Sequence, residues 1–135
     1  MIGGGNTNDA ETVALQCRLA MSALLLLTAC KPPTEARWPA DPAAAKRGLA
    51  VIERVQCAAC HEITGVDWPK GRTGPPLLDI GNRGLIAGAV PNRPDLLAAF
   101  VRNAPAVKPG SPMPPMPITD AESRDVAAYL YESGQ

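Results

Sequence analysis

Apolar residues recur at helical spacing in three stretches of the chain. The first stretch runs from residue 42 to about residue 56. Asp41 followed by Pro42 is a typical helix start, because an Asp side chain accepts hydrogen bonds from the first free N–H groups and proline suits the first helical position. The apolar positions of this stretch fall near a helical period: Ala43, Leu49, Ile52 and Val55. We therefore predict a first helix over residues 42–56.

The last stretch begins with a capping signal. In Thr119-Asp-Ala-Glu122, the Thr hydroxyl and the Glu carboxylate can each accept a hydrogen bond from the other residue's backbone N–H. One face of the predicted helix is apolar, and the helix should end before Gly134. That face carries Val126, Tyr129 and Leu130.

A third, middle helix is predicted over residues 94–103, with an apolar face formed by Leu97, Phe100 and Val101. The remaining segments are rich in Gly and Pro, and none alternates as a half-buried strand would, so the predicted class is all-α. Gly48 lies inside the first helix, where it costs about 1 kcal/mol relative to Ala. We expect it to let Tyr129 or Leu130 cross at short range; the alternative is a tolerated surface glycine.

The N-terminal region is predicted to be an export signal. Residues 19–29 form an apolar run of eleven residues, too short for a membrane-spanning helix of about 20 residues but suited to a signal peptide. Leu27-Thr-Ala-Cys30 resembles the bacterial lipobox, whose Cys is diacylated and becomes the new N-terminus. We expect a signal peptide at 1–29, a lipidated Cys30 with a tether at 30–40, and a domain at 41–135. The alternative is an ordinary signal peptide.

The charge balance excludes one class of partner, and the composition limits the size of the side chains available for the core. The chain has 13 basic and 13 acidic residues, so we expect no nucleic-acid partner, which would need a basic face. Aromatic residues make up only 4% of the chain. A small domain with so few large side chains is marginal without another source of apolar bulk.

Cys57-Ala-Ala-Cys60-His61 is typical of covalent haem attachment. Thiols three residues apart lie on one face of a helical turn, where they can add to two haem vinyl groups while the next residue binds the iron. A zinc site would need four Cys or His ligands, and a thioredoxin-like pair would need a strand–helix–strand context. A disulfide framework is the default for a short exported chain, but the four cysteines lie in different chemical contexts. The haem would also supply the missing apolar bulk.

His61 is the only histidine of the chain, which excludes two histidine ligands within one subunit. The sixth ligand is then a methionine, a weaker ligand such as Lys or Asn, or absent. From residue 30 onward the methionines are Met113 and Met116, each between prolines. A thioether ligand raises the reduction potential, and His/Met ligation is typical of electron carriers.

Together these features resemble a class I monohaem cytochrome c over residues 41 to about 132. That family has a small all-α fold, with three to four helices and Gly/Pro-rich loops around one covalently bound haem. The resemblance is closest to bacterial members whose motifs match four segments: Gly74-Pro-Pro-Leu77, Arg83-Gly-Leu-Ile-Ala-Gly88, Pro91-Asn-Arg-Pro94 and Gly110-Ser-Pro-Met-Pro114. The chain departs from the pattern with Leu85 where many members have Tyr, and Phe100 where they often have Trp.

The resemblance implies roles for individual residues. The Pro75 carbonyl would accept the His61 Nδ1 proton, Leu77 would pack on the haem, and Arg83 would pair with a haem propionate. A solvated surface arginine is the alternative for Arg83. Met113 fits the ligand position of the family motif, whereas Met116 would pack in the core beside the haem; the reverse assignment is the alternative.

The function implied is electron transfer without substrate chemistry, and so not an enzyme. We expect a lipid-anchored cytochrome on the periplasmic side of a bacterial membrane, with partners such as a bc1-type complex and a terminal oxidase or reductase, and no small-molecule substrate. Two alternatives remain: a lipid-anchored haem subunit of a larger oxidoreductase, and an open-site haem acting as a peroxidase or gas sensor. Basic residues near the haem motif could steer an acidic partner or be scattered surface charge: Lys46, Arg47, Lys70 and Arg72.

Overall fold

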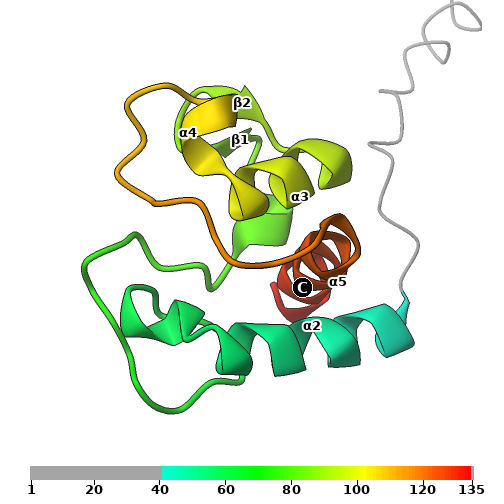
Figure 1. Cartoon of the computed structure of the whole chain (residues 1–135). Coiled ribbons are helices and arrows are strands. Elements are labelled where there is room, and N and C mark those ends of the chain that lie inside the picture. Colours follow the sequence, from blue (N-terminus) through cyan, green and yellow to red (C-terminus); the bar gives the residue numbers. More distant parts are fainter. Residues whose placement is uncertain (1–40, 135) are drawn as a thin grey trace, which may run out of the picture. The chain divides into compact units, whose positions relative to one another are not determined.

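Three helices pack together in the computed structural model, which describes residues 41–134 (Figure 1). Helix α5 (Asp120–Ser133) lies across α2 (Pro42–Arg54) and also packs against α3 (Pro94–Arg102). The predictions for the signal peptide, Cys30 and the tether lie outside the described residues. No helix within residues 41–134 is both long and apolar enough to cross a membrane.

Helix α2 begins where the sequence predicts and ends earlier. The Asp41 carboxylate accepts hydrogen bonds of 3.0 Å from the backbone N–H groups of Ala43 and Ala44, which satisfies two free donors of the first turn. The helix stops at Arg54 because Gln56 takes a left-handed conformation, with φ 62°. Ala43, which is one of the apolar positions at helical spacing in the sequence, is exposed. The buried face is instead Ala44, Ala45, Gly48, Val51 and Ile52.

Gly48 lies where α2 and α5 cross. A Cβ atom at Gly48 would lie 2.1 Å from the Asp125 carbonyl oxygen and 3.0 Å from the Tyr129 Cβ. The predicted close crossing is therefore confirmed at Tyr129, and the alternative of a surface glycine is wrong, because Gly48 is buried. Next to this crossing, Arg47 forms two hydrogen bonds to the Asp125 carboxylate, of 2.9 and 2.8 Å.

The predicted capping box of α5 is confirmed. The Glu122 N–H donates to the Thr119 hydroxyl over 3.2 Å, and the Thr119 N–H donates to the Glu122 carboxylate over 2.8 Å. Val126 and Leu130 are buried on the inner face and Tyr129 is half-buried beside them. The helix starts after the Thr119 cap and ends at Ser133, just before Gly134, as the sequence predicts.

The middle helix α3 is confirmed with the predicted inward residues, since Leu97, Phe100 and Val101 are all buried. A short helix that was not predicted, α4 (Ala104–Val107), follows directly and is capped by the Asn103 side chain. Strands β1 (Leu85–Ile86) and β2 (Val90–Pro91) were also missed. They form an antiparallel pair, but two residues per strand are too few to show alternation. The all-α class is confirmed.

Aliphatic side chains and alanines make up most of the core. Phe100 is the only aromatic residue among the buried hydrophobic side chains of residues 41–134. Tyr129 and Tyr131 pack against this core while remaining partly exposed. The low aromatic content noted in the sequence therefore corresponds to a core of small side chains.

Candidate functional site

The two cysteines of the haem motif lie on a tight turn directly after α2. The turn η2 (Cys57–Ala59) starts at the left-handed Gln56. The N–H groups of Cys60 and His61 both donate to the Cys57 carbonyl, over 3.2 and 3.1 Å. Both cysteines are free thiols, so no disulfide joins them. Burial raises the pKa of the half-buried Cys57 thiol, whereas the Cys60 side chain is exposed.

His61 is oriented by a backbone carbonyl. Its Nδ1 lies 2.8 Å from the Pro75 carbonyl oxygen, which is the contact expected from the sequence. A carbonyl oxygen can only accept, so Nδ1 carries the proton and Nε2 keeps a lone pair. A histidine held in this way by its second nitrogen is the usual form of a metal ligand. The geometry thus presents one imidazole nitrogen for an axial bond to a metal.

Gly74 allows the His61 ring to lie close to the loop that precedes Pro75. A Cβ atom at Gly74 would be 2.4 Å from His61 Cε1 and 2.6 Å from Nδ1. The Gly74 N–H also donates to the Cys60 carbonyl over 2.8 Å. This loop is therefore tied to the turn that carries the two thiols. The sequence places Gly74 in a motif, but only the structure gives it a role.

Leu77 and Arg83 both lie against the segment that holds His61. Leu77 is partly buried against the core, and its N–H donates to the Glu62 carbonyl over 2.8 Å. The Arg83 guanidinium donates to the Pro76 carbonyl over 2.9 Å. Arg83 is half-buried and bonded to the protein, so it differs from a freely solvated surface arginine. The predicted haem contacts of these two residues remain predictions.

The two methionines of the proline-rich loop have different surroundings. Met113 is partly buried and packs against the core. Met116 is half-buried but is absent from the described side chains that pack on the core, where Ile118 is found instead. The Met116 N–H donates to the Arg102 carbonyl, and its carbonyl accepts from Ile118. Ile118, at the end of this turn, packs against the core, and the role expected for Met116 beside the haem remains a prediction.

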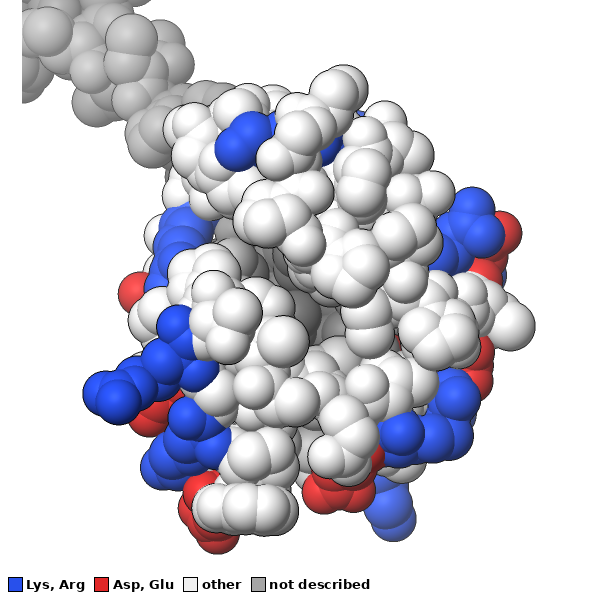
Figure 2. All heavy atoms as spheres, turned by 60° about the vertical axis from the view of Figure 1, so that its left-hand side comes forward, with Lys and Arg blue, Asp and Glu red and all other residues white. Residues whose placement is uncertain are grey.

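One face of the domain is hollowed at its centre (Figure 2). This face carries the segments 61–79 and 108–118, which lie on the left of Figure 1. The rim of the hollow is formed by uncharged residues, with Lys, Arg, Asp and Glu placed toward the periphery. Large exposed apolar side chains occur in the first of these segments and in β1: Trp68, Leu78 and Leu85. An uncharged hollow suits a flat apolar group better than a charged ligand.

The residues present fit a haem. Two free thiols lie on one turn, the adjacent His61 offers Nε2, a partly buried thioether belongs to the loop 108–118, and the face that carries this loop has a hollow with an uncharged rim. They do not fit a zinc site. Within residues 41–134, no group of three or more His, Cys, Asp or Glu side chains could hold a metal ion.

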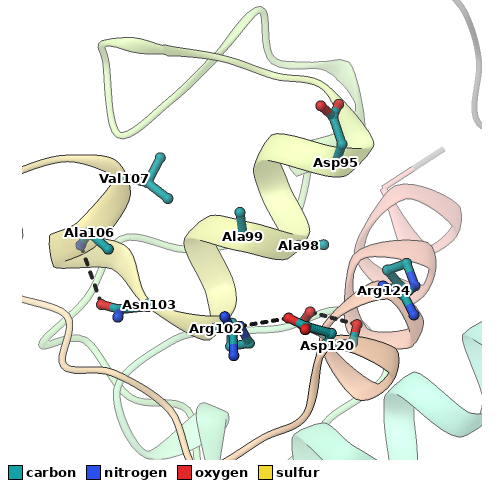
Figure 3. A pocket seen from close by; sticks show the side chains of 10 residues that line it. Asp95, Ala98, Ala99, Arg102, Asn103, Ala106, Val107, Asp120 and Arg124 are labelled. Atoms are coloured by element: carbon teal, nitrogen blue, oxygen red, sulfur yellow. Dashed lines mark hydrogen bonds and ion pairs between the residues drawn. The ribbon is translucent and has the colours of Figure 1, made fainter.

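A second concavity lies elsewhere in the domain. This pocket, of about 300 Å³, is formed by residues of α3, α4 and α5 and the segments joining them (Figure 3). Asp120 forms an ion pair of 2.8 Å with Arg102 at its edge, and Asn103 caps α4 beside it. None of the site residues predicted from the sequence lines this pocket. The chemistry that the sequence indicates belongs to the hollow.

Comparison with known protein families gives a match over most of the described residues. Residues 43–130 match the family described as cytochrome C oxidase, cbb3-type, subunit III. The matched region includes the first helix, the thiol turn, the proline loops and most of α5.

Two curated relatives carry the same name, cytochrome c oxidase subunit 2. The protein from Alkalihalophilus pseudofirmus is 31% identical over 87 residues, which cover 64% of this chain and 25% of the relative. The protein from Bacillus sp. strain PS3 is 37% identical over 75 residues, or 54% of this chain and 20% of the relative. The chain therefore spans a quarter or less of the length of these relatives.

Proposed function

The chain belongs to the cytochrome C oxidase, cbb3-type, subunit III family, and from this premise we propose that it carries single electrons through one covalently bound haem c. The family match confirms the resemblance to cytochromes c. Haem-based electron transfer is the function of such a domain. The covalent links through Cys57 and Cys60, the axial pair of His61 and Met113, and the lipid anchor at Cys30 are part of the proposal.

The single observation that carries the proposal is the orientation of His61. Its Nδ1–H is held by the Pro75 carbonyl at 2.8 Å, so Nε2 is free to bind iron without reorienting. The hydrogen bond also makes the imidazole a stronger donor. Cys57 and Cys60 lie on the turn just before it, where thioether bonds would fix the haem against the ring.

A bound haem supplies an iron that alternates between the ferric and ferrous states. The chain's part is to keep the same ligands in both states. The loop that carries Met113 includes five prolines, which restrict the unfolded chain and so reduce the entropy lost when the thioether is held in place. They are Pro109, Pro112, Pro114, Pro115 and Pro117, and Pro105 lies just before them in α4. The uncharged rim of the hollow would limit access of water and ions to the haem.

The names of the relatives support a respiratory setting. Both are oxidase subunits, and we propose that this chain exchanges electrons with a terminal oxidase or reductase, with a bc1-type complex as donor. With two acyl chains on Cys30, the domain would be anchored stably on the periplasmic side of a bacterial membrane.

A second candidate function is a haem subunit bound permanently to a larger oxidoreductase. It is favoured by the fact that the chain matches only 20–25% of proteins named as oxidase subunits, in which such a domain is part of a larger unit. Purification in mild detergent separates the two. A free carrier elutes as a small monomer, whereas a subunit elutes with other polypeptides.

The test of the proposed ligands is a comparison of Met113→Ala with Met116→Leu. The far-red absorption band of the ferric protein reports iron–thioether bonding. We expect Met113→Ala to abolish the band and to let carbon monoxide bind the reduced protein rapidly. Met116→Leu should keep the band, because its thioether is not the ligand.

Three outcomes would contradict these assignments. Loss of the band in Met116→Leu alone would make Met116 the ligand. Rapid, tight carbon monoxide uptake by the unmodified protein would contradict the carrier function and support an open-site haem. Absence of any haem after expression with a cytochrome c maturation system would remove the proposed cofactor altogether.

A further inference from the structure

Asn92 lies in the Pro91-Asn-Arg-Pro94 motif, and the proposed function gives it no role. Its side-chain Nδ2 donates two hydrogen bonds, to the Ile80 carbonyl at 2.5 Å and to the Arg83 carbonyl at 2.7 Å. Its backbone N–H donates to the Gly84 carbonyl at 3.0 Å. One half-buried side chain therefore fixes the backbone on both sides of the turn η3 (Ile80–Asn82).

The side-chain oxygen of Asn92 is held in turn by α5. The Tyr131 hydroxyl donates to Asn92 Oδ1 over 2.7 Å. Burial, with a smaller contribution from Asp95, raises the pKa of Tyr131 to about 12. The phenol therefore keeps its proton, and this hydrogen bond persists, throughout the neutral pH range. All polar atoms of the Asn92 amide are engaged, which sets its orientation.

Further hydrogen bonds connect Asn92 to His61, the predicted iron ligand. Asn92 holds the backbone of Arg83, and the Arg83 guanidinium donates to the Pro76 carbonyl at 2.9 Å. Pro76 follows Pro75, whose carbonyl lies 2.8 Å from His61 Nδ1. Helix α5 is thus connected to the His61 ring through hydrogen bonds, the side chain of Arg83 and the Pro75–Pro76 peptide link.

We propose that Asn92 is a positioning residue for His61, acting with Tyr131 through Arg83 and the Pro75–Pro76 carbonyls. The inference rests on the proposed function, in which His61 binds the haem iron. Asn92 is distant from the thiol turn in sequence, but by this inference it contributes to the reduction potential of the haem.

The expected direction follows from the hydrogen bond to Nδ1. A firmly held Nδ1–H makes His61 a stronger electron donor, which favours ferric iron. Removing the Asn92 amide frees the Arg83 backbone, lets the Pro76 loop shift and weakens the Pro75–His61 bond. The ferrous form then becomes more stable relative to the ferric form, so the reduction potential rises.

The experiment compares Asn92→Ala with the matched control Asn103→Ala in the haem-loaded chain. Asn103 also uses its side chain locally, accepting from the Ala106 N–H, and within residues 41–134 the structure shows no hydrogen bond from this side chain to Asn92, Arg83 or Pro76. We expect Asn92→Ala to favour the ferrous form up to about tenfold, which is a rise of about 59 mV for a one-electron couple. Asn103→Ala should leave the potential unchanged.

A second readout reports the hydrogen bond itself. Proton NMR of the reduced protein follows the His61 Nδ1 proton, and its exchange with solvent should become faster in Asn92→Ala but not in Asn103→Ala. Should Asn92→Ala fail to fold, Tyr131→Phe removes the hydroxyl that donates to Asn92 Oδ1, and should produce a smaller change of the same sign in both readouts.

The proposal is overturned if Asn92→Ala and Tyr131→Phe lower thermal stability but match the control in potential and in proton exchange. Asn92 would then be structural only. That result differs from failure of the proposed function, in which the unmodified chain would bind no haem or would show no His61 ligation.

Discussion

Gly74 has no side chain, and this allows the His61 ring to lie close to the Gly74-Pro75-Pro76 segment. Its missing Cβ would lie 2.4 Å from the imidazole Cε1, well inside van der Waals contact. Because the ring is also held by the Pro75 carbonyl, a shift of the ring would strain that hydrogen bond. Either the ring or the loop must move when this position gains a methyl group.

Gly74→Ala should therefore disturb both stability and ligation. Overpacking of this kind costs about 1–3 kcal/mol, and displacement of the ring should loosen the bond from Nε2 to iron. We expect a lower midpoint of thermal unfolding and a larger high-spin fraction in the absorption spectrum of the reduced haem protein.

Gly84→Ala is the matched control, since a Cβ at Gly84 would meet no atom within 4 Å. Its stability should change by less than about 0.5 kcal/mol, as for other surface substitutions. Equal spectra for Gly74→Ala and the unmodified protein would show that the loop yields and that the close approach is not needed for ligation.

At the residue scale, motifs predict contacts that are local to the motif. The Cys57 to His61 spacing and the Gly74-Pro-Pro-Leu77 segment led to the His61–Pro75 contact found in the structure. The part played by Asn92 could not be predicted, because its partners Ile80 and Tyr131 become neighbours only through the packing of α5 on η3. Sequence order holds no signal for such a contact.

At the scale of elements, the capping box of α5 links stability to pH. Hydrogen bonds from the Thr119 N–H and hydroxyl, with a smaller contribution from Arg54, lower the pKa of Glu122 below the ordinary 4.5. The carboxylate thus stabilises the folded state fully above the unfolded pKa. This contribution is lost as the pH falls through the lowered folded value.

We predict that Glu122→Gln flattens the acid side of the stability curve. Chemical denaturation between pH 3 and pH 7 should show the variant less stable than the unmodified chain at neutral pH, with the difference shrinking below about pH 4.5. Glu132→Gln is the control, because Glu132 is exposed near the other end of the same helix. Parallel curves for Glu122→Gln and the unmodified chain would contradict the linkage.

Helix starts were predicted better than the end and the buried face of α2. Asp41 and Thr119 act through hydrogen bonds within one turn, so their effect is visible in sequence. The end of α2 depends on the left-handed Gln56, which no sequence signal marks. Its buried face follows the crossing at Gly48, which places Ala44 and Ala45 inward and leaves Ala43 exposed.

At the scale of the whole molecule, the described domain is small and its core contains few large side chains. Chains of this size bury only about 60–70% of their unfolded surface. With Phe100 as the one buried aromatic side chain of residues 41–134, little apolar area is available to offset the conformational entropy lost on folding. A porphyrin covalently attached at the thiol turn would add a large apolar surface to this small core.

Folding should therefore depend on the cofactor. We expect Cys57→Ala/Cys60→Ala, which cannot form thioether bonds, to show a weak helical circular dichroism signal and a broad, non-cooperative urea transition. Met113→Ala is the control, because it loses one axial ligand but keeps the covalent haem, and it should unfold cooperatively. A native-like helical signal with a sharp transition in the double variant would mean that the small aliphatic core is sufficient. The haem would then serve only electron transfer and not the stability of the fold.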